Sequence, residues 1–297
     1  MRSNDVGLIG LGAMGLSMGK NLLKNEFNLT VFDVRDEPIR ILENLGAKAA
    51  ESPKQVGTAS KIVLLSLPSS KEVEDVVSED DGLIHSMSKN GIIIDASTID
   101  PAVVKKLANE CNKKNITFID APVSGGTIGA EKGTLSIMVG GSNDKVDECK
   151  GVLQAIGTNI YHVGNTGAGQ IFKLINNMLV AINLVGISEG FVLAKKTGID
   201  LKKLYEVLKT SAGNSWALEQ KLPKIIQNDF EPGFKVWLQH KDLSLAMNLA
   251  SQMNAALPIT SLTHQMFESA KAIGLKDLDH SAVAKIIQKL SIKDIDK

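Results

Sequence analysis

The stretch VGLIGLGAMG, residues 6–15, places the pattern GxGxxG between a short apolar run and an amphipathic segment. The run Val6–Ile9 predicts a strand, and Met14–Lys24 predicts a helix. In such a unit Gly10 permits the tight turn, Gly12 lets a pyrophosphate approach the backbone, and Gly15 lets the helix pack closely on the strand. The phosphates would lie at the helix N-terminus, where free N–H groups and the helix dipole favour anions. The residues expected to bind the cofactor in this turn are Gly10, Leu11, Gly12, Ala13, Met14 and Gly15.

An acidic residue follows the glycine turn at the spacing along the chain that dinucleotide-binding turns show. Asp33 ends the apolar run Leu29–Phe32, and an acidic residue about 20 positions beyond the glycines hydrogen-bonds the ribose hydroxyls of a dinucleotide. The same carboxylate would repel a 2′-phosphate, so we expect NAD as the cofactor, with NADP less favoured. Arg35 lies two residues further on and would soften that repulsion, so it also counts among the expected cofactor-binding residues.

The first half of the chain alternates apolar runs with amphipathic segments. The runs are continuous and rich in leucine and β-branched residues, which is typical of strands covered on both faces. They occupy residues 6–9, 29–32, 61–65, 91–94, 116–119, 135–139 and 160–163. The helical segments between them are residues 14–24, 38–44, 71–77, 101–112 and 145–155. Alternation at this spacing predicts βαβ units and a mainly parallel sheet.

The pattern changes after Gly164, beyond which no convincing strand occurs. Residues from about 168 to 196 form one long apolar segment, interrupted by Lys173, Asn177 and other polar side chains. These interruptions are too frequent for a membrane span, so we interpret the segment as a long, largely buried helix. Shorter helical patterns follow at residues 201–210, 215–227, 241–253, 261–272 and 281–290. We therefore expect two domains, residues 1–165 and 166–297.

The composition excludes several classes of protein. The chain has 297 residues, 33 basic and 33 acidic side chains, 43% hydrophobic and 22% charged residues, which is ordinary globular composition. A net charge of zero argues against a protein that binds nucleic acid or anionic membranes through its overall field. Cys111 and Cys149 have no paired spacing, and the five histidines form no HxxxH pair, so we expect neither a disulfide scaffold nor a metal site.

The zero total conceals a difference between the two halves. Residues 1–165 carry 17 basic and 21 acidic side chains, whereas residues 166–297 carry 16 and 12. The half with the glycine turn is therefore acidic and the helical half is basic. Because the basic residues are dispersed and aromatic residues make up only 4% of the chain, this polarity favours local attraction of a small anion over binding of nucleic acid.

Two further segments carry residues suited to chemistry. Asp120–Gly126 (DAPVSGG) follows a predicted strand, and its adjacent glycines could present backbone N–H groups to a carboxylate, although a flexible loop is an equally good interpretation.

Lys173 and Asn177 lie four residues apart at the start of the long helix, so they share one face. Apolar neighbours favour the neutral amine of Lys173, which suits proton transfer, but a lysine at the margin of a packed helix has the same pattern.

Four motifs occur in one order along the chain: Gly10–Gly15, Asp120–Gly126, Gly167–Asn177 and Lys241–Leu243. Their combination resembles the β-hydroxyacid dehydrogenase family, of 6-phosphogluconate dehydrogenase-like architecture, which includes 3-hydroxyisobutyrate dehydrogenases and tartronate semialdehyde (2-hydroxy-3-oxopropionate) reductases. The resemblance covers essentially the whole chain. It implies an α/β Rossmann-type N-terminal domain with a mainly parallel sheet, a long interdomain helix, and an all-α C-terminal domain for substrate binding and oligomerisation. It also implies hydride transfer between a nicotinamide cofactor and a small hydroxy acid.

The resemblance assigns roles by position. Lys173 matches the catalytic lysine, which takes the hydroxyl proton of the substrate in oxidation or donates a proton in reduction. Asn177 would hold the same oxygen or orient the lysine. The expected substrate contacts are Ser124, Gly125, Gly126, Thr98, Asn214, Trp216, Phe234 and Asp242. The further positions expected beside the cofactor are Leu67, Pro68, Thr98 and Lys241.

The sequence leaves the substrate open. Gly213–Trp216 and Thr263–Phe267 are similar to L-threonate dehydrogenases, whereas Glu231–Phe234 and Asp279–Ala282 are shared with tartronate semialdehyde reductases. An Asn–Ser pair favours a hydroxylated acid over 3-hydroxyisobutyrate, because its donors and acceptors cost free energy when left unpaired. Trp216 could equally be a filler of the core. Succinic semialdehyde reductase and sulfolactaldehyde reductase are further alternatives.

A different class of function is a catalytically inactive relative that binds nucleotide. Such a protein would lack a proton-transfer residue, whereas Lys173 and Asn177 are both present. The resemblance further implies a homodimer or homotetramer. The N-terminus has no charged and apolar signal pattern, so we expect a cytoplasmic protein with neither a membrane nor nucleic acid as partner.

Overall fold

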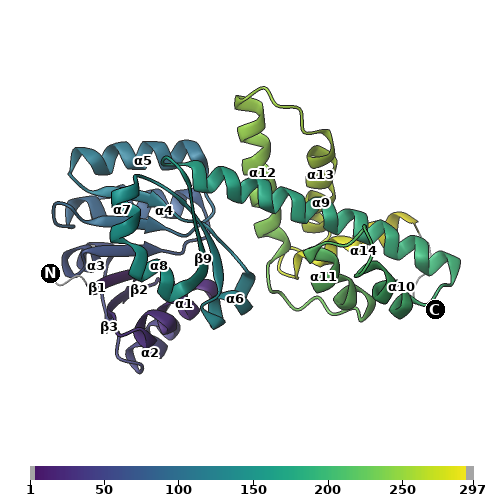
Figure 1. The fold of residues 1–297 in the computed structure, drawn as a ribbon, viewed down its shortest axis with the longest axis horizontal. Coiled ribbons are helices and arrows are strands. Elements are labelled where there is room, and N and C mark those ends of the chain that lie inside the picture. Colours follow the sequence, from purple (N-terminus) through teal and green to yellow (C-terminus); the bar gives the residue numbers. More distant parts are fainter. Residues whose placement is uncertain (1–3, 292–297) are drawn as a thin grey trace. The chain divides into compact units, whose positions relative to one another are not determined.

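The computed structural model describes residues 4–291 and forms two compact units, Met1–Lys173 and Leu174–Lys297 (Figure 1). The first unit is built on one mainly parallel sheet, and the second is helical. The predicted fold class is therefore confirmed. The division after residue 165 stays a prediction, and its outer ends, residues 1–3 and 292–297, lie outside the described residues.

The sheet of the first unit has the strand order β3-β2-β1-β4-β5-β6-β8-β7, with β9 paired to β8. All pairs from β3 across to β6 are parallel, and β8 runs antiparallel to β6 and β7. The strands are β1 (Asp5–Ile9), β2 (Asn28–Phe32), β3 (Lys48–Ala49), β4 (Ile62–Leu65), β5 (Ile92–Asp95), β6 (Thr117–Asp120), β7 (Val123–Ser124), β8 (Leu135–Gly140) and β9 (Gly157–Gly164). The strand order reverses between β1 and β4, which is where open sheets of this kind bind ligands.

Helices cover both faces of this sheet. One core joins α1, α2 and α8 to the face that bears Leu8 and Leu64, and a second joins α3, α4 and α5 to the face that bears Ile9 and Val63. Because successive side chains of a strand point to opposite faces, every strand between the two cores must be apolar throughout, which explains the continuous apolar runs. The helices are α1 (Ala13–Lys24), α2 (Asp36–Glu43), α3 (Pro53–Ala59), α4 (Ser70–Ser78), η1 (Leu83–His85), α5 (Pro101–Lys113), α6 (Gly126–Lys132), α7 (Asn143–Glu148) and α8 (Lys150–Ile156).

The carboxyl ends of the parallel strands lie in one row. The register pairs Ile9 with both Phe32 and Leu65. It continues from Leu65 to Asp95 and from Asp95 to Asp120. The segments that leave these five strand ends therefore open at the same edge of the sheet, and they carry the glycine turn, Asp33, Leu67, Thr98 and Ser124.

Several short elements were not predicted. Strands β3 and β7 have two residues each, too few for any periodicity. Helix α3 is short and capped by Ser52, and α6 begins within the glycine pair of the predicted loop. The single helix predicted over residues 145–155 is wrong, because α7 ends at Glu148 and α8 starts at Lys150.

The second unit packs helices around a core that includes Leu184, Val236 and Phe267. Its elements are the continuation of α9 (Ala168–Thr197), with α10 (Leu201–Leu208), α11 (Trp216–Ile226), α12 (Val236–Gln252), α13 (Pro258–Ala272), η2 (His280–Val283) and α14 (Ala284–Ser291). Among residues 4–291, α9 alone is long and apolar enough to cross a membrane by length and composition, a test that a core helix also passes. Only 44% of its most apolar window is buried, so α9 is less buried than predicted.

Candidate active site

The glycine turn has the geometry that its sequence requires. Gly10 adopts a φ of +90°, in the region that favours glycine, and a Cβ there would lie 2.3 Å from the Ser66 carbonyl oxygen. A Cβ at Gly15 would lie 1.9 Å from the carbonyl oxygen of Gly10, so α1 packs directly on the turn that follows β1. Both positions are thus limited to glycine by the protein itself.

Gly12 is different, because the protein leaves room beside it. A Cβ at Gly12 would meet no described atom within 4 Å. Gly12 is also the N-cap of α1, and within the described part of the chain no side chain caps this end of the helix. Open space and free N–H donors at a helix N-terminus fit the pyrophosphate of a dinucleotide.

Asp33 lies beside this turn as expected. Its Oδ2 accepts a hydrogen bond from the Leu11 N–H at 2.6 Å, and its Oδ1 accepts from the Arg35 Nε at 2.9 Å. Partial burial opposes ionisation of Asp33, but the Arg35 guanidinium and the Leu11 N–H hold its pKa below the usual value. Arg35 therefore neutralises part of the carboxylate that would select against a 2′-phosphate. The Arg35 side chain is 58% exposed, and its Nη2 donates a second hydrogen bond to Asp33 Oδ2 at 3.1 Å.

The turn after β5 is held by residues that the sequence did not single out. Ser97 accepts a hydrogen bond on its Oγ from the Leu67 N–H at 2.9 Å, which links two predicted cofactor positions, Leu67 and Thr98, through Ser97. The side chain of Gln170 hydrogen-bonds the backbone on both sides of Thr98. Pro68 follows Leu67 and directly precedes Ser69, the N-cap of α4.

Asp120, at the end of β6, anchors the start of α9. Its Oδ1 accepts from the Gly167 N–H at 2.7 Å and its Oδ2 from the Gln170 N–H at 3.0 Å. Burial raises the pKa of the Asp120 carboxyl to about 6, although these backbone donors oppose the rise. A carboxylate here stabilises the positive end of the helix dipole, so Asp120 fixes the first turn of the helix that carries Lys173.

The raised pKa of Asp120 predicts a pH dependence of stability. In the folded state the carboxyl retains its proton up to a pH of about 6, whereas in the unfolded chain it loses the proton near its usual 3.8. The free energy of unfolding therefore falls as pH rises from about 4 to 6. Relative to Asp120→Asn, the wild type should lose up to about 3 kcal/mol over this interval in urea unfolding. A constant difference between the two proteins would contradict the assignment.

Ser124, Gly125 and Gly126 form the short strand β7 and the turn into α6. Gly125 has a φ of +130° and Gly126 a φ of +63°, conformations that require glycine in practice. A Cβ at Gly126 would meet no described atom within 4 Å. The segment thus forms a glycine turn into α6, with open space beside its second glycine.

Lys173 lies on the second turn of α9 and is only 8% exposed. Phe172 and Ile175, by contrast, are about half exposed. The lysine thus points inward while apolar neighbours point outward, which reverses the usual placement of these residue types. Lys173 is therefore not an exposed surface charge.

In the second unit, Asn177 and Asp242 are joined. The Asn177 Nδ2 donates to Asp242 Oδ2 at 2.5 Å, and Lys241 Nζ lies 3.2 Å from Asp242 Oδ1. The Gln239 Nε2 donates to the Asn177 carbonyl oxygen at 3.0 Å. Asn177 and Asp242 are almost completely buried, so α9 and α12 are connected by a fixed polar contact.

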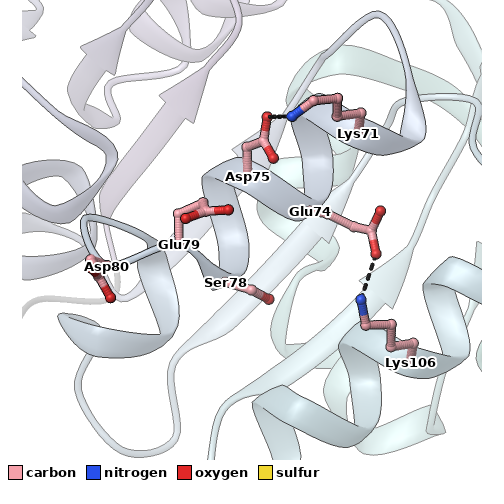
Figure 2. Close-up of a pocket in the computed structure, with 7 residues that line it drawn as sticks. All are labelled: Lys71, Glu74, Asp75, Ser78, Glu79, Asp80 and Lys106. Carbon is pink, nitrogen blue, oxygen red and sulfur yellow. Dashed lines mark hydrogen bonds and ion pairs between the residues drawn. The ribbon is translucent and has the colours of Figure 1, made fainter.

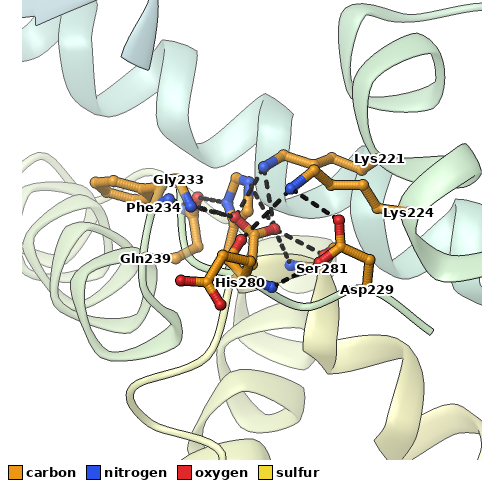
Figure 3. A network of polar contacts seen from close by, with 10 residues as sticks. Lys221, Lys224, Asp229, Gly233, Phe234, Gln239, His280 and Ser281 are labelled. Atoms are coloured by element: carbon orange, nitrogen blue, oxygen red, sulfur yellow. Dashed lines mark hydrogen bonds and ion pairs between the residues drawn. The ribbon is translucent and has the colours of Figure 1, made fainter. Parts of the chain in front are cut away.

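The second unit also contains a buried polar network around Asp279. Figure 3 labels its members Lys221, Gly233, Phe234, Gln239, His280 and Ser281. Lys221 donates to both carboxylate oxygens at 3.0 and 2.9 Å, and the Gly233 and Phe234 N–H groups donate to Oδ2. Burial opposes ionisation, but Lys221 and the other donors hold the pKa of Asp279 well below its usual range. This network was missed in the sequence, because Lys221, Gly233 and Phe234 lie 58, 46 and 45 residues from Asp279 along the chain.

His280 connects that network to Asn177. Its Nδ1 lies 3.2 Å from Gln239 Oε1, and burial lowers the pKa of His280, so the ring is neutral at pH 7. Because Gln239 donates through its Nε2, its Oε1 is the acceptor and the His280 proton must lie on Nδ1. Phe234, a predicted substrate contact, packs edge-on against the His280 ring.

Asn214 and Trp216 are not joined to these residues by any contact described within the second unit. Asn214 donates to the Lys209 carbonyl and to Glu219 Oε1, and its own Oδ1 accepts from the Ser215 N–H. The polar atoms of the Asn214 side chain therefore stabilise the turn before α11. Trp216 is 55% exposed, so it is not core filler within this unit.

A separate surface hollow lies over α4 and α5 (Figure 2). It is lined by Lys71, Glu74, Asp75, Ser78, Glu79, Asp80 and Lys106. Both lysines are paired with carboxylates, at 2.6 and 2.7 Å, so the hollow is predominantly acidic and unsuited to phosphate. Over residues 4–291 no three histidine, cysteine, aspartate or glutamate side chains are grouped as metal ligands.

Both halves of the chain are similar in sequence to known proteins. Residues 5–164 match the sequence model for the NAD binding domain of 6-phosphogluconate dehydrogenase, and residues 167–287 match that for the NAD-binding of NADP-dependent 3-hydroxyisobutyrate dehydrogenase. A 2-(hydroxymethyl)glutarate dehydrogenase of Eubacterium barkeri is 40% identical over 98% of this chain and 97% of its own length. An NAD-dependent L-serine dehydrogenase of Pseudomonas aeruginosa is 35% identical over 95% of this chain and 97% of its own length.

Solved structures are similar as well. The crystal structure of a 3-hydroxyisobutyrate dehydrogenase from Salmonella typhimurium superposes with a TM-score of 0.87. It shares 31% sequence identity with the chain and covers 95% of it, and the match extends over 99% of that structure. The similarity therefore includes the glycine turn, the sheet and the helical second half.

Proposed function

The chain belongs to the β-hydroxyacid dehydrogenase family of nicotinamide-dependent oxidoreductases, and we propose that it interconverts a small 3-hydroxy acid and its semialdehyde with NAD as the preferred cofactor. The observation that carries the proposal is Lys173, a buried lysine on a helix whose first turn is bonded to the end of β6. The glycine turn opens at the same edge of the sheet. A cofactor site and a proton-transfer group thus belong to one unit.

The proposed chemistry assigns a proton to Lys173. A bound nicotinamide would accept a hydride from the carbinol carbon in oxidation and return it in reduction. Lys173 takes the hydroxyl proton as the C=O bond forms, and in the reverse direction it donates that proton to the carbonyl oxygen. Asn177, one turn further along α9, hydrogen-bonds the same oxygen or holds the lysine.

The remaining proposed residues bind and orient. The Ser124 hydroxyl and the backbone N–H groups of Gly125 and Gly126 hold the substrate carboxylate, because successive N–H groups in a turn form a concave anion receptor. Lys241 adds a positive charge in the basic half of the chain. Further proposed substrate contacts are Thr98, Asn214, Trp216, Phe234 and Asp242.

The substrate class is proposed from the chemistry that three relatives share. 2-(Hydroxymethyl)glutarate, L-serine and 3-hydroxyisobutyrate, which appear in the names of these proteins, all have the form HOCH₂–CH(R)–COO⁻. They differ only in R, which is carboxyethyl, ammonium or methyl. We therefore propose a primary alcohol on the carbon next to the one that bears the carboxylate.

A panel of acids tests this class. NAD reduction should be measured with 2-(hydroxymethyl)glutarate, 3-hydroxyisobutyrate, L-serine, glycerate, threonate, γ-hydroxybutyrate and sulfolactate. The control is the diol in which CH₂OH replaces the carboxylate of 3-hydroxyisobutyrate. We expect kcat/KM for the diol to be at least about 100-fold lower than for the best acid, since a carboxylate receptor is then left unpaired. Equal rates for the diol and the acid would overturn the carboxylate role.

The preference for NAD predicts the effect of Asp33→Ala. Loss of the carboxylate removes an acceptor for the ribose hydroxyls and frees Arg35 to meet a 2′-phosphate. The ratio of kcat/KM for NAD to that for NADP should fall by about 10- to 100-fold. Asp36→Ala is the control, because Asp36 is exposed and pairs only loosely with Arg40, at 4.0 Å. An unchanged ratio in Asp33→Ala would remove Asp33 from cofactor selection.

We also propose a homodimer or homotetramer. In α9, Ile175, Leu179 and Leu193 are 49%, 51% and 66% exposed, and exposed apolar side chains on one long helix favour association. Light scattering should give two or four times the mass of one chain. Leu193→Glu should weaken this association, and a monomeric mass for the wild type would contradict it.

A further inference from the structure

We propose that Gln170 is a positioning residue that holds the Thr98 turn and the helix of Lys173 in a fixed relation. The proposal rests on the function proposed above for Lys173 and Thr98. In this positioning role Gln170 touches neither substrate nor cofactor. Gln170 acts through its hydrogen bonds to the two segments that do.

The side chain of Gln170 hydrogen-bonds the Thr98 turn in both directions. Its Nε2 donates to the Ser97 carbonyl oxygen at 2.9 Å, and its Oε1 accepts from the Ile99 N–H at 3.1 Å. Gln170 is fully buried, so water does not compete for these bonds. One amide thus fixes the backbone immediately before and immediately after Thr98.

The backbone of Gln170 is tied to a second strand end. Its N–H donates to Asp120 Oδ2, while Asp120 Oδ1 accepts from Gly167. The first turn of α9 is therefore bonded to the end of β6 through Asp120 and to the segment after β5 through the Gln170 side chain. Two separate anchors leave this turn little freedom to rotate or slide.

Lys173 follows Gln170 by three residues in α9. Residues three apart are neighbours on a helix surface, so any shift of Gln170 moves the lysine with it. A misplacement of about 1 Å at a reacting group is sufficient to cost about 100-fold in rate. Gln170 therefore sets the distance between the proton-transfer group and the Thr98 turn.

Only a group with one donor and one acceptor satisfies both backbone partners. An ionised carboxylate accepts from the Ile99 N–H but repels the Ser97 carbonyl oxygen, whereas a protonated carboxyl donates to one and accepts from the other. Glutamate at position 170 would be fully buried near Asp120. Burial and that carboxylate raise its pKa, while a charged Lys173 three residues further along the helix opposes the rise. Gln170→Glu should therefore regain the wild-type hydrogen bonds in acid.

The experiment measures kcat and KM against pH for the wild type and for Gln170→Glu. At pH 8 we expect kcat of the variant to fall by about 10- to 100-fold, with KM for the acid changed less. As pH falls to 6, the ratio of variant to wild-type kcat should rise at least about fivefold, because protonation restores the donor. A ratio that does not change with pH, or a kcat equal to the wild type at pH 8, would overturn the proposal.

A second variant and a control separate positioning from folding. Gln170→Met removes both bonds with a side chain of similar length, and it should lower kcat at every pH without recovery in acid. Gln55→Met is the matched control, since Gln55 also accepts from a backbone N–H and donates to an oxygen, but at the surface. Each protein is checked for folding by circular dichroism. Full activity in Gln170→Met would overturn the proposal even if Gln170→Glu did not fold.

The outcome is distinguishable from failure of the proposed function. If Lys173→Ala retained activity, the role of Lys173 would be wrong whatever Gln170 does. If Lys173→Ala were inactive and both Gln170 variants were fully active, only the positioning role would be lost.

Discussion

Lys173→Ala is expected to lower kcat by about 10² to 10⁴-fold while NADH binding stays within about threefold of the wild type. Proton transfer to or from the substrate oxygen has no other proposed carrier on α9, because Asn177 has no titratable group. The lysine is also buried, so solvent does not readily replace it. Steady-state kinetics give kcat, and quenching of protein fluorescence gives the affinity for NADH.

Lys196→Ala provides the matched control for this variant. Lys196 lies in the last turn of the same helix and is exposed, so its removal should leave kcat unchanged. A Lys173→Ala enzyme with more than about a tenth of wild-type kcat would remove Lys173 from acid–base catalysis. Loss of NADH binding together with activity would instead indicate a collapsed first unit.

Gly12→Val is expected to abolish cofactor binding without unfolding the protein. The added side chain meets no described protein atom near its Cβ, and the φ of −64° at Gly12 is accessible to any residue. The unfolding free energy should therefore change by less than about 0.5 kcal/mol. The valine occupies the space that we assign to the pyrophosphate, so the Kd of NADH should rise by at least about 100-fold.

Two other glycine variants in the first unit serve as comparisons for Gly12→Val. Gly15→Ala should unfold at lower temperature even without cofactor, because its Cβ would lie 1.9 Å from the Gly10 carbonyl oxygen. Gly151→Val should leave both stability and NADH binding nearly unchanged, since a Cβ there makes only an ordinary 3.7 Å contact with Phe27. Wild-type affinity for NADH in Gly12→Val would show that the open space beside Gly12 is not the cofactor site.

Sequence patterns predicted the elements whose causes are local. The glycine turn, the continuous strands and the long helix each follow from neighbouring residues, and the structure confirms the fold that they imply. The split between α7 and α8 was not predicted, because apolar periodicity continues across Cys149. Strand β7 has two residues and pairs with β8, which no local pattern specifies.

The supporting residues of the site could not be predicted in the same way. Gln170 and Asp120 lie within two of the four sequence motifs, but their contacts could not be predicted, since their partners lie 47 to 73 residues away. The contact of Asn177 with Asp242 spans 65 residues, and only the resemblance suggested Asp242. Asn214 and Trp216 were also suggested by resemblance alone, and their polar atoms and exposure within the second unit do not tie them to Asn177.

The structure shows what several acidic side chains of the first half of the chain do. Asp33, Asp95 and Asp120 place carboxylates at the ends of three strands in the acidic first unit, where they bind backbone N–H groups. These carboxylates stabilise the turns that hold the proposed site, so the proposed attraction of a substrate anion depends on lysines and backbone donors. Local charge, and not the net charge of zero, is therefore the relevant quantity.

The most direct test of the account follows one hydrogen atom. The protein is incubated with NAD and a 3-hydroxy acid in which both hydrogens of the hydroxymethyl carbon are replaced by deuterium, and the reduced cofactor is analysed by mass spectrometry. We predict that NADH gains one deuterium for each aldehyde formed, and that Lys173→Ala binds the cofactor but yields almost no labelled product. Absence of labelled NADH with every acid of the panel, despite tight cofactor binding, would contradict the account and indicate a nucleotide-binding protein without dehydrogenase activity.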